Sequence, residues 1–146
     1  MYIKQSELFT GTSMDFVKKF MDISEMSSHK KGEVLFREND PAKFFFILLN
    51  GCVKLSVGEP QQVVYNAGRN GEAFGWSSLI GGEVYSASAE CIEATELLKT
   101  SCDKLSRVLE ADPDNGIIFF RQLAATLGNR LLEVYKMITP KIGNSK

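Results

Sequence analysis

The fold interpretation depends on one stretch, Gly71-Glu72-Ala73-Phe74-Gly75-Trp76-Ser77-Ser78-Leu79-Ile80, which is closed by Tyr85-Ser86-Ala87-Ser88-Ala89. Two glycines four residues apart mark places where the backbone turns sharply or approaches another group closely. The hydroxyl residues after the second glycine favour a short helix, whose first N–H groups and positive dipole end would face an anion. The alternating segment that follows predicts a strand, which returns Ser86 to the same place. On these residues alone, a glycine-rich turn between two strands is the better explanation, and support for an anion site comes from the rest of the chain.

Length and composition are those of an ordinary soluble domain. The 146 residues have a net charge of −1, with 44% hydrophobic and 24% charged residues. We therefore predict a single domain over residues 1–146, with no overall electrostatic attraction to nucleic acid or to an anionic membrane. No apolar run is long enough to span a membrane, and the first residues lack the layout of a signal peptide. The prediction is a cytoplasmic protein.

Cysteine and histidine content argues against a metal or disulfide framework. Cys52, Cys91 and Cys102 are odd in number and scattered, which favours reduced, mostly buried thiols. His29 is the single histidine, so a cluster of histidine ligands within one chain is excluded. We expect His29 at the solvated surface, and neither a metal nor a cofactor.

Two short patterns resemble active or metal sites but lack the residues that would complete them. Ser101-Cys102-Asp103-Lys104 fits S-x-x-K without the companion motifs of that enzyme class. Asp112-Pro113-Asp114-Asn115-Gly116 begins like a calcium loop, but its twelfth position is Leu123 instead of glutamate. Helix capping explains the second pattern better, and the sequence indicates no enzyme.

The predicted elements run from one helix through short strands to further helices. Ser13 caps a helix over 13–22, and residues 25–99 form the β region. Asn50-Gly51 predicts a two-residue hairpin between its flanking strands. About seven or eight short strands at this spacing indicate a closed antiparallel jelly roll or barrel. The strands that we place individually are 34–36, 44–49, 52–57, 62–65, 84–89 and 94–98.

The last third of the chain, residues 103–138, is predicted to be helical. A short helix over 103–111 is followed by a long one that Asp112 caps and that ends near Ile138, before Thr139-Pro140. Such a helix measures about 35 Å at 1.5 Å per residue, which is longer than a small barrel can cover. Its apolar residues recur three and four apart, as in a dimer seam, although a single wide core face would give a similar pattern. The seam residues are Ile117, Phe120, Ala124, Leu127, Leu131, Val134 and Ile138. A second stripe, with Phe119 and Leu123, is expected to face the β core.

Three segments together resemble the cyclic-nucleotide-binding domain of the catabolite activator protein (Crp/Fnr-like) family: residues 31–42, 46–55 and 71–75. The resemblance spans roughly residues 7–138. It implies an α+β fold, an antiparallel β-roll with flanking helices and a long C-terminal dimerisation helix. The family's transcription factors continue into a helix-turn-helix domain. This sequence ends at Lys146 instead, so we expect no such domain and no specific DNA binding.

The opening stretch matches the family's phosphate-binding cassette, and the resemblance implies ligand contacts there. The cassette residues are Gly71, Glu72, Phe74, Gly75, Trp76, Ser77, Ser78, Leu79, Tyr85, Ser86 and Ala87. Trp76 stands where the family's nucleotide binders hold the ribose with a glutamate, and Tyr85 stands where they hold the phosphate with an arginine. Only Ser86 matches. The lost arginine contact is worth about 1.5–3 kcal/mol, so tight cAMP or cGMP binding is not expected.

Together these observations predict a non-enzymatic, homodimeric sensor or regulatory module with a small-molecule ligand of unknown identity. Two alternatives remain: a dimerisation or scaffold module with a vestigial pocket, and a cyclic-nucleotide binder with an atypical site. A cupin-like metalloenzyme is disfavoured by the single histidine. Trp76 is expected to line the cavity, with a core position pointing away from it as the alternative.

Overall fold

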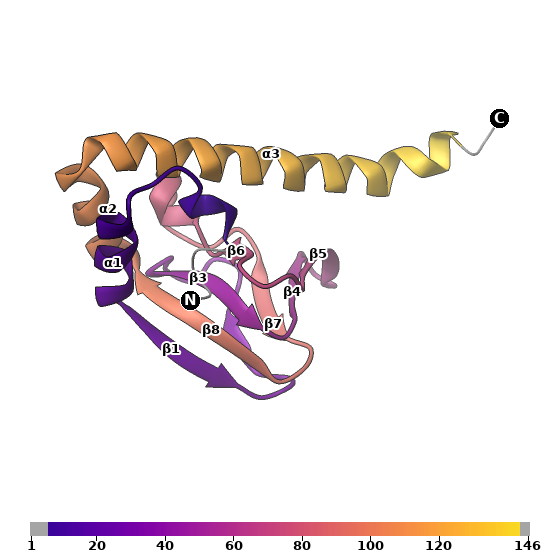
Figure 1. The fold of residues 1–146 in the computed structure, drawn as a ribbon. Helices are drawn as coiled ribbons and strands as arrows, with labels where there is room; N and C mark the ends of the chain where they lie inside the picture. The colour runs from indigo at the N-terminus through magenta and orange to yellow at the C-terminus, as the bar shows by residue number, and fades with distance from the viewer. Residues whose placement is uncertain (1–5, 144–146) are drawn as a thin grey trace.

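The computed structural model describes residues 6–143, with side chains to residue 138. It contains two four-stranded antiparallel sheets, with strand orders β1-β8-β3-β6 and β2-β7-β4-β5. Helices cover one side of this β-roll, and α3 runs along its top and beyond it (Figure 1). The elements are η2 (Glu7–Phe9), α1 (Met14–Asp22), β1 (Ser24–His29), β2 (Val34–Phe36), β3 (Phe44–Asn50), β4 (Val53–Val57), β5 (Gln62–Ala67), β6 (Ala73–Phe74), η3 (Ser77–Ile80), β7 (Ser88–Cys91), β8 (Thr95–Ser101), α2 (Cys102–Ala111) and α3 (Pro113–Gly143). The predicted fold class is confirmed.

Strand β3 explains why the core has two parts. Side chains alternate along a strand, so a strand with apolar groups on both faces must be covered on both. Phe45 and Ile47 point into a helix-side core, whereas Phe46 and Leu48 point between the sheets. The helix-side core consists of Leu8, Phe9, Phe16, Val17, Phe20, Phe45, Ile47, Ala73, Leu98, Cys102, Leu105, Leu109, Phe119 and Leu123. The inter-sheet core consists of Phe36, Ala42, Phe46, Leu48, Val53, Leu55, Ala67, Phe74, Tyr85, Ala89, Cys91 and Leu97.

The predicted helix starts are confirmed by their caps. The Ser13 side chain accepts a hydrogen bond from Phe16 N at 3.2 Å, which satisfies a free N–H at the start of α1. Asp112 does the same for α3, since its Oδ1 accepts from Asn115 N at 3.4 Å. Phe119 and Leu123 are buried in the helix-side core, so the second stripe faces the β-roll as expected.

The Asn50-Gly51 hairpin prediction is wrong. These residues join β3 to β4, but the two strands lie in different sheets and do not pair with each other. Gly51 is needed for another reason: its φ is +114°, and a Cβ there would lie 2.7 Å from Thr95 Cα. The turn carries the chain from one sheet to the other against the start of β8.

Three further differences concern element boundaries. The strand predicted over 84–89 begins only at Ser88, so Tyr85 and Ser86 lie in the preceding loop. Strand β1, which we did not place individually, has few apolar residues and is held by pairing with β8. The long helix continues past Thr139-Pro140 to Gly143, so the predicted end near Ile138 is too early.

Most of the remaining surface of α3 is exposed. Ile117, Leu131 and Ile138 are 59%, 50% and 62% exposed, and the C-terminal part of the helix projects past the β-roll (Figure 1). No helix in the described part of the chain is both long and apolar enough to cross a membrane.

We predict that Gly51→Ala lowers the free energy of unfolding by about 2–4 kcal/mol, from a strained positive φ and a clash with β8. Gly32→Ala is the matched control: its φ is +90°, but a Cβ there meets nothing within 4 Å, so only the strain remains. Urea unfolding of both variants measures the difference. Equal losses in the two would contradict the close approach to Thr95.

Candidate functional site

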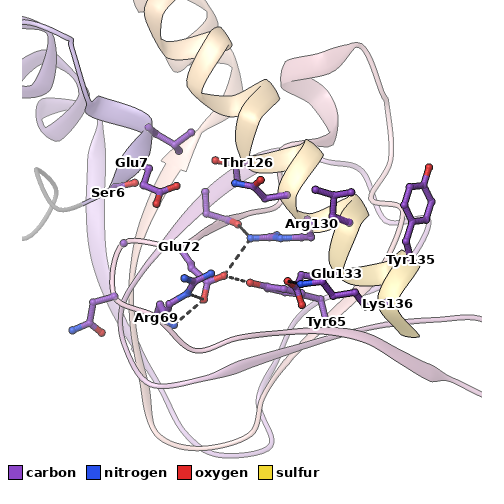
Figure 2. A pocket seen from close by; sticks show the side chains of 16 residues that line it. Ser6, Glu7, Tyr65, Arg69, Glu72, Thr126, Arg130, Glu133, Tyr135 and Lys136 are labelled. Atoms are coloured by element: carbon purple, nitrogen blue, oxygen red, sulfur yellow. Dashed lines mark hydrogen bonds and ion pairs between the residues drawn. The ribbon is translucent and has the colours of Figure 1, made fainter. Parts of the chain in front are cut away.

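A cavity of about 560 Å³ lies between α3 and the segment that joins β5 to β6. Arg130 forms part of its wall and reaches from α3 towards Glu72, as Figure 2 shows. The polar side chains around the cavity include Glu7, Tyr65, Arg69, Glu72, Thr126, Asn129, Arg130, Glu133 and Lys136. The cavity therefore combines three carboxylates with three cations, and its lining carries no excess of either charge.

Arg130 is the buried charge of this site. Its side chain is 10% exposed, and its Nη2 donates to the Ala73 carbonyl at 2.9 Å and lies 3.5 Å from the Glu72 carboxylate. The guanidinium carbon lies 4.3 Å from the centre of the Tyr65 ring and 4.5 Å from that of Trp76. Burial lowers the pKa of Arg130, while Tyr65 and Glu72 act in the opposite direction. Two aromatic faces and a carboxylate thus compensate for removing this cation from water.

Glu72 connects Arg130 to the β5–β6 turn. Its Oε1 accepts hydrogen bonds from Gly68 N at 3.0 Å and Arg69 N at 2.8 Å. Its Oε2 accepts from the Tyr65 hydroxyl and also faces Arg130. Burial and the bond to Glu72 raise the pKa of Tyr65. A carboxylate with this many donors is held in one orientation, so the turn presents a fixed negative charge to α3.

Trp76 and Tyr85 have different surroundings. Trp76 is half-buried and packs against the helix-side core, and the Arg130 guanidinium lies over its ring. Tyr85 is only 4% exposed and stacks on Phe36 in the inter-sheet core, with ring centres 3.7 Å apart. Its hydroxyl donates to the Phe44 carbonyl at 2.7 Å and accepts from Phe44 N at 3.0 Å. Burial raises the pKa of Tyr85 to about 12. Neither aromatic residue is among those that line the cavity.

The structure brings the other predicted cassette residues only partly together. Gly71 and Glu72 line the cavity, whereas Phe74 is buried in the inter-sheet core and Gly75 turns against Phe46 with a φ of +78°. The residues Ser77, Ser78 and Leu79 form most of η3, a single turn of 3-10 helix. Ser86 is exposed, and Ala87 packs partly against the inter-sheet core.

The site residues predicted from the sequence did not include Arg130 or Tyr65. Arg130 follows Phe119, Leu123 and Leu127 on the same face of α3, at helical spacing. A cation that continues a core-facing stripe needs a buried partner, so this position of Arg130 could have indicated a site residue. Its partners lie more than 50 residues earlier in the sequence, so the pattern alone could not identify them.

The predicted dimer seam lies mostly on the open side of α3. Ala124 and the residues Ile117, Phe120, Leu131 and Ile138 are exposed, and Val134 is half-buried. Leu127 differs, because it packs partly against the helix-side core. A second cavity, between η3, α2 and the start of α3, is lined by Ile117 and Phe120 among others.

His29 is less solvated than expected. Its Nδ1 pairs with the Glu33 carboxylate, and its Nε2 lies 2.9 Å from Ser27 Oγ.

Among the cysteines, Cys91 and Cys102 are buried and Cys52 is half-buried; burial raises the pKa of all three thiols. Within residues 6–143 no group of three or more histidine, cysteine, aspartate or glutamate side chains is placed to hold a metal ion.

Comparison with known proteins agrees with this architecture. Human cGMP-dependent protein kinase 2 is 30% identical over 90 residues, which are 60% of this chain and 12% of that kinase. The chain therefore spans only a small part of the curated relatives that it matches. The catabolite activator protein of Thermus thermophilus has a TM-score of 0.73 at 26% identity, covering 91% of this chain and 62% of that chain.

A cyclic nucleotide-binding domain from Methylobacillus flagellatus has a TM-score of 0.81 at 23% identity, covering 96% of this chain and 82% of that chain. At that identity the likeness shows the fold. The family model described as cyclic nucleotide-binding domain matches residues 26–112, from β1 through α2 to the cap of α3. This match covers more than half of the sequence, and the chain belongs to the cyclic nucleotide-binding domain family.

Proposed function

We propose that the chain is a non-enzymatic, homodimeric regulatory module whose phosphate-binding cassette does not bind cyclic nucleotides. One observation carries the proposal: the guanidinium of Arg130 lies against Trp76, at the cassette position where the family holds a ribose. The space between the long helix and this part of the cassette is thus occupied by the chain's own side chain. Small-molecule binding belongs instead to the cavity beside Glu72.

The fate of the second cassette position supports the same proposal. Tyr85 stands where the family places its phosphate-binding arginine, and it is committed to the inter-sheet core by Phe36 and Phe44. Ser86 is then the one side chain that matches the family's phosphate-binding residues. One neutral hydroxyl with backbone N–H groups replaces little of a charge-assisted, bidentate contact.

Homodimerisation is supported by the exposed apolar residues of α3. Ile117, Leu131 and Ile138 lie on one side of a 31-residue helix that extends past the β-roll. The full set of seam residues from Ile117 to Ile138 recurs three and four apart, which is the spacing of two helices packed along a seam. We propose that a second copy of the chain covers this face, and that the chain by itself does not bind specific DNA.

We predict that cAMP and cGMP do not bind at concentrations up to about 100 µM, because the cassette lacks its counter-charge. Titration calorimetry measures the heat of binding, and the fluorescence of Trp76, the single tryptophan, reports on the cassette directly. Trp76→Phe is the spectroscopic control, since it removes the reporter. Saturable binding in the micromolar range by calorimetry would refute the proposal.

We predict that Leu131→Glu converts the dimer into monomers at tens of micromolar, because burying a leucine from each copy contributes about 1.5–3 kcal/mol per side chain. Light scattering measures the molar mass. Met14→Glu, at a 60% exposed position on α1, is the control that keeps the dimer. A wild-type protein that is monomeric under these conditions would show that α3 is no dimer seam.

A scaffold without a ligand is distinguished from a sensor by native mass spectrometry of the purified protein. We expect one small molecule per chain, released on denaturation. Protein that is free of any bound molecule, and that shows no stabilisation in a metabolite screen, favours the scaffold.

A further inference from the structure

The groups that surround Arg130 all belong to the β-roll and its connecting segments. Tyr65 comes from β5, Glu72 and Ala73 from the β5–β6 turn and the start of β6, and Trp76 from the residue before η3. Arg130 alone comes from α3. The β-roll therefore contributes two aromatic faces, one carboxylate and one carbonyl oxygen that meet around a single cation.

These four groups together match a guanidinium better than any other common cation. A guanidinium is flat and weakly hydrated, so it stacks on aromatic rings while its edge donates to oxygen acceptors. Both ring centres lie within 4.5 Å of its central carbon, and both oxygen acceptors are contacted by Nη2. An ammonium is compact and strongly hydrated, so it cannot fill the same flat space.

We propose that Tyr65, Glu72, Ala73 and Trp76 form a guanidinium-binding site, which Arg130 of the chain's own α3 fills in the described conformation. A small guanidinium compound enters this site when the Arg130 side chain is absent, and competes with it when it is present. Arg130 is then a positioning residue that docks α3 on the β-roll. The inference does not depend on whether the cassette binds a nucleotide.

The opposite possibility is that Arg130 anchors an anion in the adjoining cavity. Its Nη1 has no hydrogen-bond partner among the described residues, which leaves the two N–H groups of that nitrogen for such a ligand. However, that nitrogen is itself buried, and Glu7, Glu72 and Glu133 line the same cavity. The three carboxylates of this lining match its three cations, so no excess of positive charge attracts an anion, and the two aromatic faces favour a cation between them. Anion binding is therefore an outcome of the test.

The test is chemical rescue of Arg130→Ala by ethylguanidinium, which restores the atoms that the substitution removes. We expect the variant to melt roughly 10 °C below the wild type, because Glu72 loses its buried partner. Millimolar ethylguanidinium should raise the melting temperature and change Trp76 fluorescence saturably. Binding to the wild type should be at least tenfold weaker, because the tethered Arg130 competes at a high effective concentration.

Three controls make the result specific. n-Butylammonium, which has the same charge and similar length, should bind the variant at least fivefold more weakly. Arg130→Ala combined with Glu72→Gln should lose the rescue. Arg130→Lys should also be clearly less stable than the wild type, a comparison that needs no added ligand and decides the question if Arg130→Ala does not fold.

Several outcomes would overturn the inference. Equal rescue by n-butylammonium, no saturable binding of ethylguanidinium to a folded variant, or a fully stable Arg130→Lys protein would each show that the site does not select a guanidinium. Inorganic phosphate that stabilises the wild type but not Arg130→Ala would identify Arg130 as an anion anchor instead.

Discussion

The structure depends on one buried charge pair, between Arg130 of α3 and Glu72 of the β5–β6 turn. A guanidinium removed from water without a partner costs several kcal/mol, so α3 can dock only where the carboxylate and the aromatic faces meet it. Rotating the helix by one residue, about 100°, would place Asn129 or Leu131 against Glu72 and leave both charges unpaired. Apolar packing by Phe119 and Leu123 brings α3 to the β-roll, and the charge pair fixes its register.

Trp76 and Tyr85, at the two predicted cassette positions that depart from the family pattern, have separate physical roles. Trp76 lies outside the inter-sheet core and supplies a face for Arg130, so its large ring lies where the helix meets the roll. Tyr85 instead completes the inter-sheet core and satisfies both backbone groups of Phe44. Reversing one substitution would leave the other in place: a glutamate at position 76 would gain a neighbouring cation, whereas an arginine at position 85 would be buried among aromatic rings. The site is therefore not one substitution away from the family pattern.

Local patterns predicted the fold well because its elements are locally specified. The apolar run of β3, the caps at Ser13 and Asp112 and the core stripe of α3 each follow from residue type and period. The errors arise where distant contacts decide. Gly51 looks like a hairpin glycine but makes room for β8, and β1 is a strand because β8 pairs with it. The role of Arg130 also depends on distant contacts, since its partners come from three other segments.

The position of Arg130 beside Leu131 has a consequence for regulation. Neighbouring helix residues point about 100° apart, so α3 carries its buried cation on one face and its exposed apolar residues on another. A rotation or shift of the helix that moves the guanidinium out from between Tyr65 and Trp76 moves the exposed face as well. If a second copy packs on that face, occupancy of the cation site and dimerisation are linked through one rigid element. Such linkage is reciprocal: whatever stabilises the docked helix favours the matching dimer geometry by the same free energy.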